Sequence, residues 1–385
     1  MKRTLLAHAR VVFPTEVRDN VAVLIEGDTI TAIDPSSAAG ATEINLSGRT
    51  LMPGMIDLHC DALEKEAEPR PGVHFPFDFA CAQADKRNAA AGITTVFHAL
   101  SFANAELGVR NNATAAELAR AIHTWQAHAL IDNRVHARYE ITDITAPPVL
   151  HELIANGEVH LLSFMDHTPG QGQFKDVDAY RNYLARTYKK DTAEIEALLA
   201  DKLAQGEGAF ERMASLSTAA RAAGVPLASH DDDRPEKVDI VKGLGVAVSE
   251  FPINLETAQA ARAAGLATLF GAPNILRGKS QSGSMRALDA VLADVADCLC
   301  GDYSPAALLP AVLRLPELAG IPLHEAVALV TRNPARAVGL SDRGEITVGK
   351  RADLVAVRTL GHLPQAARVW SAGVPALTLA FSHGR

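Results

Sequence analysis

The side chains with the clearest chemistry are histidines and carboxylates that follow apolar runs of the chain. His59 and Asp61 end one such run, and residues two apart on a strand point the same way, so both are placed to grip one metal ion. Four more residues occupy the same kind of position: Glu140, His167, His230 and Asp302. Imidazole and carboxylate ligands suit Zn²⁺, Mn²⁺ or Fe²⁺. A metal held in this way acidifies water and polarises the bond under attack, which predicts hydrolysis.

These residues meet only if the fold gathers the ends of several strands. After Gly54 the sequence alternates strand-like apolar runs with helical patterns. The eight predicted strands are Met55–His59, Ile93–Ala99, Val135–Ile141, Val159–Met165, Val225–Ser229, Val246–Phe251, Ala267–Gly271 and Cys298–Gly301. This order predicts an α/β fold, a (β/α)8 TIM-like barrel, with the six residues at the carboxyl ends of its strands. A doubly wound sheet is the alternative, but its usual glycine-rich dinucleotide turn is absent from the sequence.

Both ends of the chain are rich in β patterns and flank the predicted barrel. Apolar runs at Leu5–Phe13 and Val21–Ile33 precede a further predicted strand at Glu43–Leu51. Short apolar strands alternate with turns from Arg343 onward. We therefore expect one small discontinuous β domain, made of residues 1–52 with 343–385, beside a hydrolase barrel of residues 53–342.

Composition excludes several classes of protein. The 385 residues carry a formal net charge of −8, which argues against nucleic acid as a partner. No apolar run reaches the roughly 18 residues of a membrane span, so no membrane partner is expected. The 4 cysteines are too few for a disulfide scaffold, which favours buried thiols and a cytoplasmic location. A homo-oligomer stays open.

Most other histidines are expected to be structural or to lie on the surface. His123, His128, His136, His151 and His160 fall in or near predicted helices or at the starts of predicted strands. Barrel enzymes carry their chemistry at the opposite strand ends, so these five are predicted to lie away from it.

The first predicted barrel strand carries a recognisable motif. It resembles the first strand of the amidohydrolase superfamily and comprises residues 51–59 (LMPGMIDLH). Residues 331–335 (TRNPA) and 349–355 (GKRADLV) resemble that superfamily's exit into its β domain.

Further blocks are similar to the PhnM family of the bacterial carbon–phosphorus lyase pathway. They are residues 59–65 (HCDALEK), 69–73 (PRPGV), 163–174 (SFMDHTPGQGQF), 227–232 (LASHDD), 249–252 (SEFP), 271–280 (GAPNILRGKS) and 302–309 (DYSPAALL). The resemblance runs in order over nearly the whole chain. It implies α-D-ribose 1-methylphosphonate 5-triphosphate diphosphatase activity, in which water attacks the triphosphate and pyrophosphate leaves.

The resemblance also implies a polyanionic small-molecule substrate and roles for the residues above. Cations and a serine near the expected mouth are predicted to bind phosphate: Lys65, Arg70, Arg277, Lys279 and Ser280. Two divalent ions are expected, zinc ahead of manganese or iron. The first would lie on His59, Asp61, His230 and Asp302, and the second on Glu140 and His167. Asp302 is also the expected general base.

Two positions differ from the family's usual pattern. Ala62 follows Asp61, and Gln281 stands between two serines. Three alternatives therefore stay open: an amidohydrolase that cleaves a C–N bond, a paralogue acting on another phosphate ester, and a non-enzymatic subunit that kept the barrel.

Overall fold

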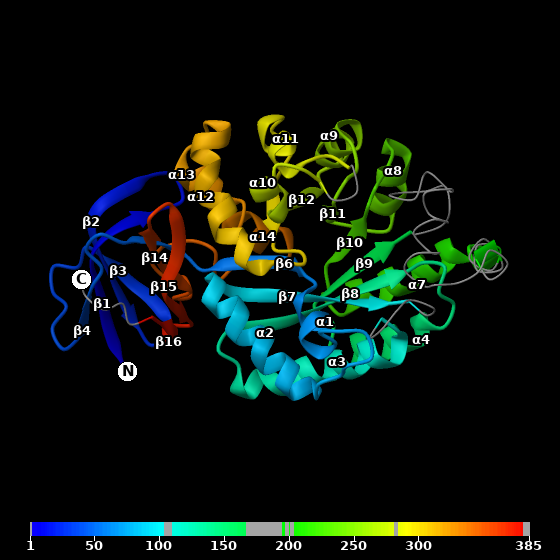
Figure 1. The fold of residues 1–385 in the computed structure, drawn as a ribbon, viewed down its shortest axis with the longest axis horizontal. Coiled ribbons are helices and arrows are strands. Elements are labelled where there is room, and N and C mark those ends of the chain that lie inside the picture. The colour runs from blue at the N-terminus through cyan, green and yellow to red at the C-terminus, as the bar shows by residue number, and fades with distance from the viewer. Residues whose placement is uncertain are drawn as a thin grey trace.

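The structure is a computed structural model that describes residues 2–103, 110–166, 195–196, 200, 204–280 and 284–379. Two positions raised by the sequence, His167 and Gln281, lie outside these ranges. Figure 1 shows a barrel beside a second sheet that contains strands from both ends of the chain.

The barrel is an eight-stranded parallel sheet whose strands follow one another in chain order. They are β6 (Met55–Cys60), β7 (Ile93–Phe102), β8 (Asp132–Glu140), β9 (Leu161–Met165), β10 (Leu227–His230), β11 (Val248–Glu250), β12 (Ala267–Gly271) and β13 (Cys298–Cys300). Strands β6 and β7 are buried along their whole length, as expected where helices cover one face and side chains fill the other. The predicted (β/α)8 barrel is confirmed.

Helices surround the strands (Figure 1). They are α1 (Ala62–Ala67), α2 (Phe77–Ala91), α3 (Asn112–Trp125), α4 (Ala146–Ala155), α7 (Ala209–Ala222), α8 (Pro235–Gly243), α9 (Leu255–Ala263), α10 (Pro273–Arg277), α11 (Ala287–Leu292), α12 (Leu308–Ala319), α13 (Leu323–Ala328) and α14 (Arg332–Ala337). Two of them start at an asparagine cap: Asn111 accepts from the N–H of Thr114, and Asn254 accepts from that of Thr257. Proline in the first turn begins α8, where its missing N–H costs little.

The two ends of the chain form one further sheet. Its N-terminal strands are β1 (Arg3–Val12), β2 (Val17–Glu26), β3 (Thr29–Ile33), β4 (Thr42–Asn45) and β5 (Thr50–Pro53). Its C-terminal strands are β14 (Leu354–Leu360), β15 (Leu363–Ser371) and β16 (Val374–Thr378), and the two sets meet where β14 pairs antiparallel with β5. The expected strand Glu43–Leu51 is instead two strands, both parallel to β1, because a turn with Gly48 at φ +70° separates them. The exact domain boundaries stay a prediction.

Strands β6 and β13 complete the barrel through contacts at their two ends. At the carboxyl end, the N–H of Asp302 donates to the carbonyl of His59 (2.8 Å), and the N–H of Asp61 donates to the carbonyl of Asp302 (3.0 Å). At the amino end, the carbonyls of Leu329 and Val330 accept from β13 and β6, each at 2.8 Å. The backbone at the mouth therefore holds three of the predicted site residues in register.

A buried ion-pair group joins the barrel to the terminal sheet at the opposite end. Arg343 donates from Nη1 to Asp132 Oδ2 (2.7 Å) and to Thr95 Oγ1 (2.9 Å), at the starts of two barrel strands. The same nitrogen lies 3.9 Å from Asp353, which precedes β14. Arg351 also contacts Asp353, at 3.1 Å. These charges connect the two parts of the molecule.

Candidate metal centre

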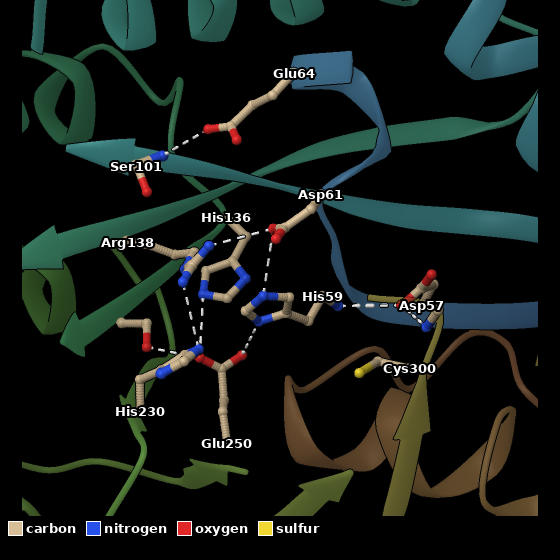
Figure 2. Close-up of polar contacts among 12 residues, drawn as sticks. Asp57, His59, Asp61, Glu64, Ser101, His136, Arg138, His230, Glu250 and Cys300 are labelled. Carbon is tan, nitrogen blue, oxygen red and sulfur yellow. Dashed lines mark hydrogen bonds and ion pairs between the residues drawn. The ribbon is translucent and has the colours of Figure 1, made fainter. Parts of the chain in front are cut away.

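Glu250, the last residue of β11, organises a group of buried side chains at the barrel mouth (Figure 2). Its Oε1 accepts from His59 Nδ1 (3.1 Å), and its Oε2 accepts from Ser163 Oγ (2.7 Å) and lies 3.5 Å from His136 Nε2. Burial works to lower the pKa of His59, but Glu250 and Asp61 together outweigh it and raise that pKa to about 10. Burial lowers the pKa of His136 to about 3. Glu250 thus orients the ring of His59 and lies beside that of His136.

Asp61 lies among cationic side chains on the other side of His59. Its Oδ1 is 3.2 Å from Arg138 Nη1 and 3.5 Å from His59 Nε2, and its Oδ2 is 3.6 Å from Arg110 Nη2. Burial alone would raise the pKa of Asp61, but Arg138 and His59 outweigh it and hold that pKa well below its ordinary value. Arg110 also donates to Glu64 (2.8 Å), so two carboxylates share its charge.

Asp302 directly follows Gly301 at the end of the last strand and has φ +52°. The residues after β10 and β11, Asp231 and Phe251, have φ +53° each. This left-handed conformation is unfavourable for residues with a Cβ, so its repetition at three strand ends shows that the mouth imposes sharp turns there. Burial, and then the charge of Asp61, raise the pKa of Asp302 to about 6. That value suits a carboxylate that accepts protons near neutral pH.

Asp57 connects the first and last barrel strands beneath these side chains. Its Oδ1 accepts from the N–H of Gly301 (3.0 Å) and from the N–H of His59 (3.2 Å). Burial raises the pKa of Asp57 to about 7. Asp57 therefore fixes the backbone that carries both His59 and Asp302.

The donors at the mouth fit a divalent metal ion. One group of ligand atoms within 4.8 Å of one another comes from His59, Asp61 and Asp302, and a second comes from His59, His230 and Glu250. Nitrogen and carboxylate oxygen donors of this kind suit zinc, manganese or iron. His230 Nδ1 also lies 3.1 Å from Asp231 Oδ2, an arrangement that commonly orients metal-binding histidines.

The structure brings four of the predicted ligands together: His59, Asp61, His230 and Asp302. Glu140 is buried at the end of β8, accepts from Thr142 Oγ1 (3.0 Å) and belongs to neither ligand group found among the described residues. The predicted phosphate-binding residues Lys65, Arg70, Arg277 and Lys279 are exposed, and Ser280 is half-buried. Arg277 contacts the residue after Asp302, because its Nη1 donates to Tyr303 Oη (3.0 Å).

Sequence reasoning missed three residues of this centre: His136, Arg138 and Glu250. His136 was expected to lie at a strand start, but β8 begins at Asp132, three residues earlier than predicted, so His136 lies mid-strand with its ring 5.0 Å from that of His59. His136, Arg138 and Glu140 alternate along this strand and so share one face. That spacing was a signal in the sequence, whereas the role of Glu250 depends on contacts with distant strands.

Comparisons with known proteins identify the family of this chain. The sequence model of the amidohydrolase family matches residues 50–380 of this chain. The α-D-ribose 1-methylphosphonate 5-triphosphate diphosphatase of Escherichia coli (strain K12) is 35% identical over 354 residues, which cover 91% of this chain and 94% of the relative. Among the described helices, none is both long and apolar enough to cross a membrane.

Solved structures agree on the fold. The N-acetyl-D-glucosamine-6-phosphate deacetylase of Mycobacterium smegmatis superposes with a TM-score of 0.66 at 17% identity, covering 97% of this chain and 100% of that one. The dihydropyrimidinase of Brevibacillus agri NCHU1002 gives 0.58 at 15% identity, covering 98% and 95%. The family match and the E. coli relative together establish that this chain belongs to the amidohydrolase family.

Proposed function

We propose that this chain is a metal-dependent diphosphatase that hydrolyses α-D-ribose 1-methylphosphonate 5-triphosphate to the 5-phosphate and pyrophosphate. The observation that carries the proposal is the 35% identity over 91% of the chain to the E. coli diphosphatase. The buried donors at the mouth support it, because enzymes of this family generally use divalent metals. A cytoplasmic location and a small polyanionic substrate go with this function.

His59, Asp61 and Asp302 are proposed to hold the ion, with zinc preferred over manganese or iron. His59 would offer Nε2: its Nδ1 faces Glu250 at 3.1 Å and keeps its proton, and the ion would take the place of the proton on Nε2. When bound, the ion supplies a Lewis acid that acidifies water and polarises a phosphoryl oxygen.

The chain's own residues supply proton transfer and positive charge. Asp302, whose pKa burial and Asp61 raise to about 6, accepts the proton of the attacking water. Arg110 and Arg138 place two guanidinium groups beside Asp61, and guanidinium groups match phosphate oxygens in geometry and charge. Arg277 is proposed to contact the phosphates from the rim.

Phosphorus NMR of the reaction products tests the function directly. The zinc-loaded full chain is incubated with the ribose triphosphate phosphonate and, separately, with N-acyl substrates. We expect pyrophosphate and the ribose 5-phosphate product to accumulate in the first reaction. Unchanged triphosphate beside a cleaved amide would instead assign a C–N hydrolase.

Replacing the proposed base tests its role. Asp302→Asn keeps the shape of the side chain but removes its basicity, so turnover is expected to fall by about 10²–10⁴-fold. Asp294→Asn is the matched control, because Asp294 has the same φ of +52° and a side chain that is 99% exposed. Turnover of Asp302→Asn at the level of the control would exclude Asp302 as the base.

A further inference from the structure

Arg138 lies deep in the mouth, between two residues expected to bind metal. Its side chain is 7% exposed, and it projects from β8 on the same face as His136. Nη1 lies 3.2 Å from Asp61 Oδ1, and Nη2 lies 3.5 Å from His230 Nε2. Among the described residues, none accepts a hydrogen bond from its buried Nε. Figure 2 shows the guanidinium beside the ring of His136, with dashed contacts to Asp61 and His230.

The two candidate ligand groups compete for one residue. His59 belongs to both of them. Its Nδ1 faces Glu250 (3.1 Å) and its Nε2 faces Asp61 (3.5 Å), and a neutral imidazole has a lone pair on only one ring nitrogen. One His59 ring therefore cannot serve an ion in each group at the same time.

The Glu250 carboxylate is also engaged already. It accepts from Ser163 (2.7 Å) and from His59, and it lies 3.5 Å from His136. A carboxylate that accepts hydrogen bonds from both His59 and Ser163 acts more readily as an orienting group for His59 than as a ligand. Among the described donors of this mouth, one ion on the His59, Asp61 and Asp302 group is the best use.

We propose that Arg138 is the second cation of this centre: it lies between Asp61 and His230, supplies positive charge that a second metal ion would otherwise supply, and binds a phosphate oxygen of the substrate. Guanidinium is charged at every physiological pH and presents several donors in one plane, so it can hold Asp61 and a phosphate oxygen together. The centre then binds one divalent ion per chain, in place of the two expected from the sequence. The phosphate part rests on the proposed function.

The first test counts zinc. The full chain is saturated with zinc, freed of unbound metal and analysed by inductively coupled plasma mass spectrometry. We expect one zinc per chain in the natural protein, in Arg138→Lys and in Arg138→Gln, because the loss of Arg138 frees no further ring nitrogen of His59. Two ions per chain in the natural protein would overturn the proposal.

The second test measures binding of inorganic tripolyphosphate to protein loaded with one equivalent of zinc. A lost charge-assisted contact is expected to weaken binding by about tenfold to a hundredfold in Arg138→Gln, with a smaller loss in Arg138→Lys. Arg134→Gln is the matched control, because Arg134 lies on the same strand at its far end and pairs with Asp132. Arg138→Gln that binds tripolyphosphate like the natural protein would contradict the proposal.

These readouts separate the proposal from the proposed function. Neither zinc content nor tripolyphosphate binding requires turnover of the ribose substrate. A chain that releases no pyrophosphate but shows the expected zinc counts and the tripolyphosphate loss refutes the diphosphatase activity while supporting Arg138 as the second cation. Circular dichroism checks the fold of each variant, and Arg138→Lys decides the binding test if Arg138→Gln does not fold.

Discussion

Gly301 shows how closely single residues are packed beneath the metal centre. A Cβ on this residue would lie 2.5 Å from Asp57 Oδ2 and 2.7 Å from the Cα of Pro305. The proline backbone cannot move aside as a flexible side chain could. Gly301 therefore lets the last strand approach Asp57 closely enough to donate its N–H.

Gly301→Ala is expected to destabilise the protein and weaken its zinc affinity. Overpacking of this kind costs about 1–3 kcal/mol, and the shift would move Asp302, the next residue. Gly243→Ala is the control, because no atom lies within 4 Å of the Cβ it would gain. Urea unfolding and zinc titration of both variants give the comparison, and unchanged values for Gly301→Ala would show that the strand can relax.

At the residue scale, the sequence indicated the ligands at strand ends but not their neighbours. His59, Asp61, His230 and Asp302 follow apolar runs, so their position relative to the strands was readable. Glu250 also ends a strand, but its importance comes from contact with His59, 191 positions earlier in the chain. Contacts at such separation leave no local pattern.

At the scale of elements, His160 ties the start of β9 to β8. Its backbone N–H donates to the carbonyl of Val135 (2.9 Å), and its Nδ1 accepts from the N–H of Val135 (3.1 Å). Burial, and then the charge of Arg134, lower the pKa of His160 from 6.5 to about 4. Protonation would remove the acceptor at Nδ1.

This arrangement predicts a pH dependence of stability. Between about pH 6.5 and 4 the unfolded chain binds a proton at this histidine and the folded chain does not, so the free energy of unfolding falls as the pH falls through that window. The side chain of His160→Asn keeps a hydrogen-bond acceptor but does not titrate. The free energy of unfolding of this variant is therefore expected to fall less between pH 7 and pH 5 than that of the natural protein. Urea unfolding at pH 7, 6 and 5 measures this dependence, and His362→Asn, at an exposed histidine, is the control. An equal change of the free energy of unfolding with pH in His160→Asn and in the natural protein would refute the role of His160.

Strand bounds were predicted well where the strand is apolar throughout and less well where its first residues are polar. Strand β12 has the predicted bounds Ala267–Gly271. Strand β8 begins earlier than Val135 because Asp132 pairs with Arg343 and Asn133 donates to Asp85 (2.9 Å). These distant partners allow polar residues in a buried strand, and a local apolar pattern cannot reveal them.

At the scale of the whole molecule, the Arg343 ion-pair group decides whether the barrel and the terminal sheet unfold together. The Arg343 side chain is 6% exposed and that of Asp353 is 2% exposed. Removing one partner of a buried ion pair typically costs roughly 3–5 kcal/mol, because the remaining charge stays buried. Arg343→Met should therefore uncouple the two parts.

The two tryptophans report on this coupling separately. Trp125 ends α3 beside the barrel, whereas Trp370 is buried in the terminal sheet. Trp125→Phe leaves only Trp370 as a fluorescent reporter, and Trp370→Phe leaves only Trp125. With Arg343 present, the two variants are expected to unfold in urea at the same midpoint. With Arg343→Met added, they are expected to unfold at two different midpoints. Arg336→Met, at a side chain that is 71% exposed, should leave the midpoints together. Coincident transitions with Arg343→Met would mean that other contacts couple the parts.

The seam between the first and last barrel strands also sets the order of events during synthesis. Asp302 bonds to the backbone of His59, so the proposed ligands meet only when the eighth strand docks against the first. A ribosome delivers residue 302 long after residue 59, and the sheet partner of β5 later still. The nascent chain therefore cannot assemble the His59, Asp61 and Asp302 site early, and metal selection by that site belongs to the nearly finished protein.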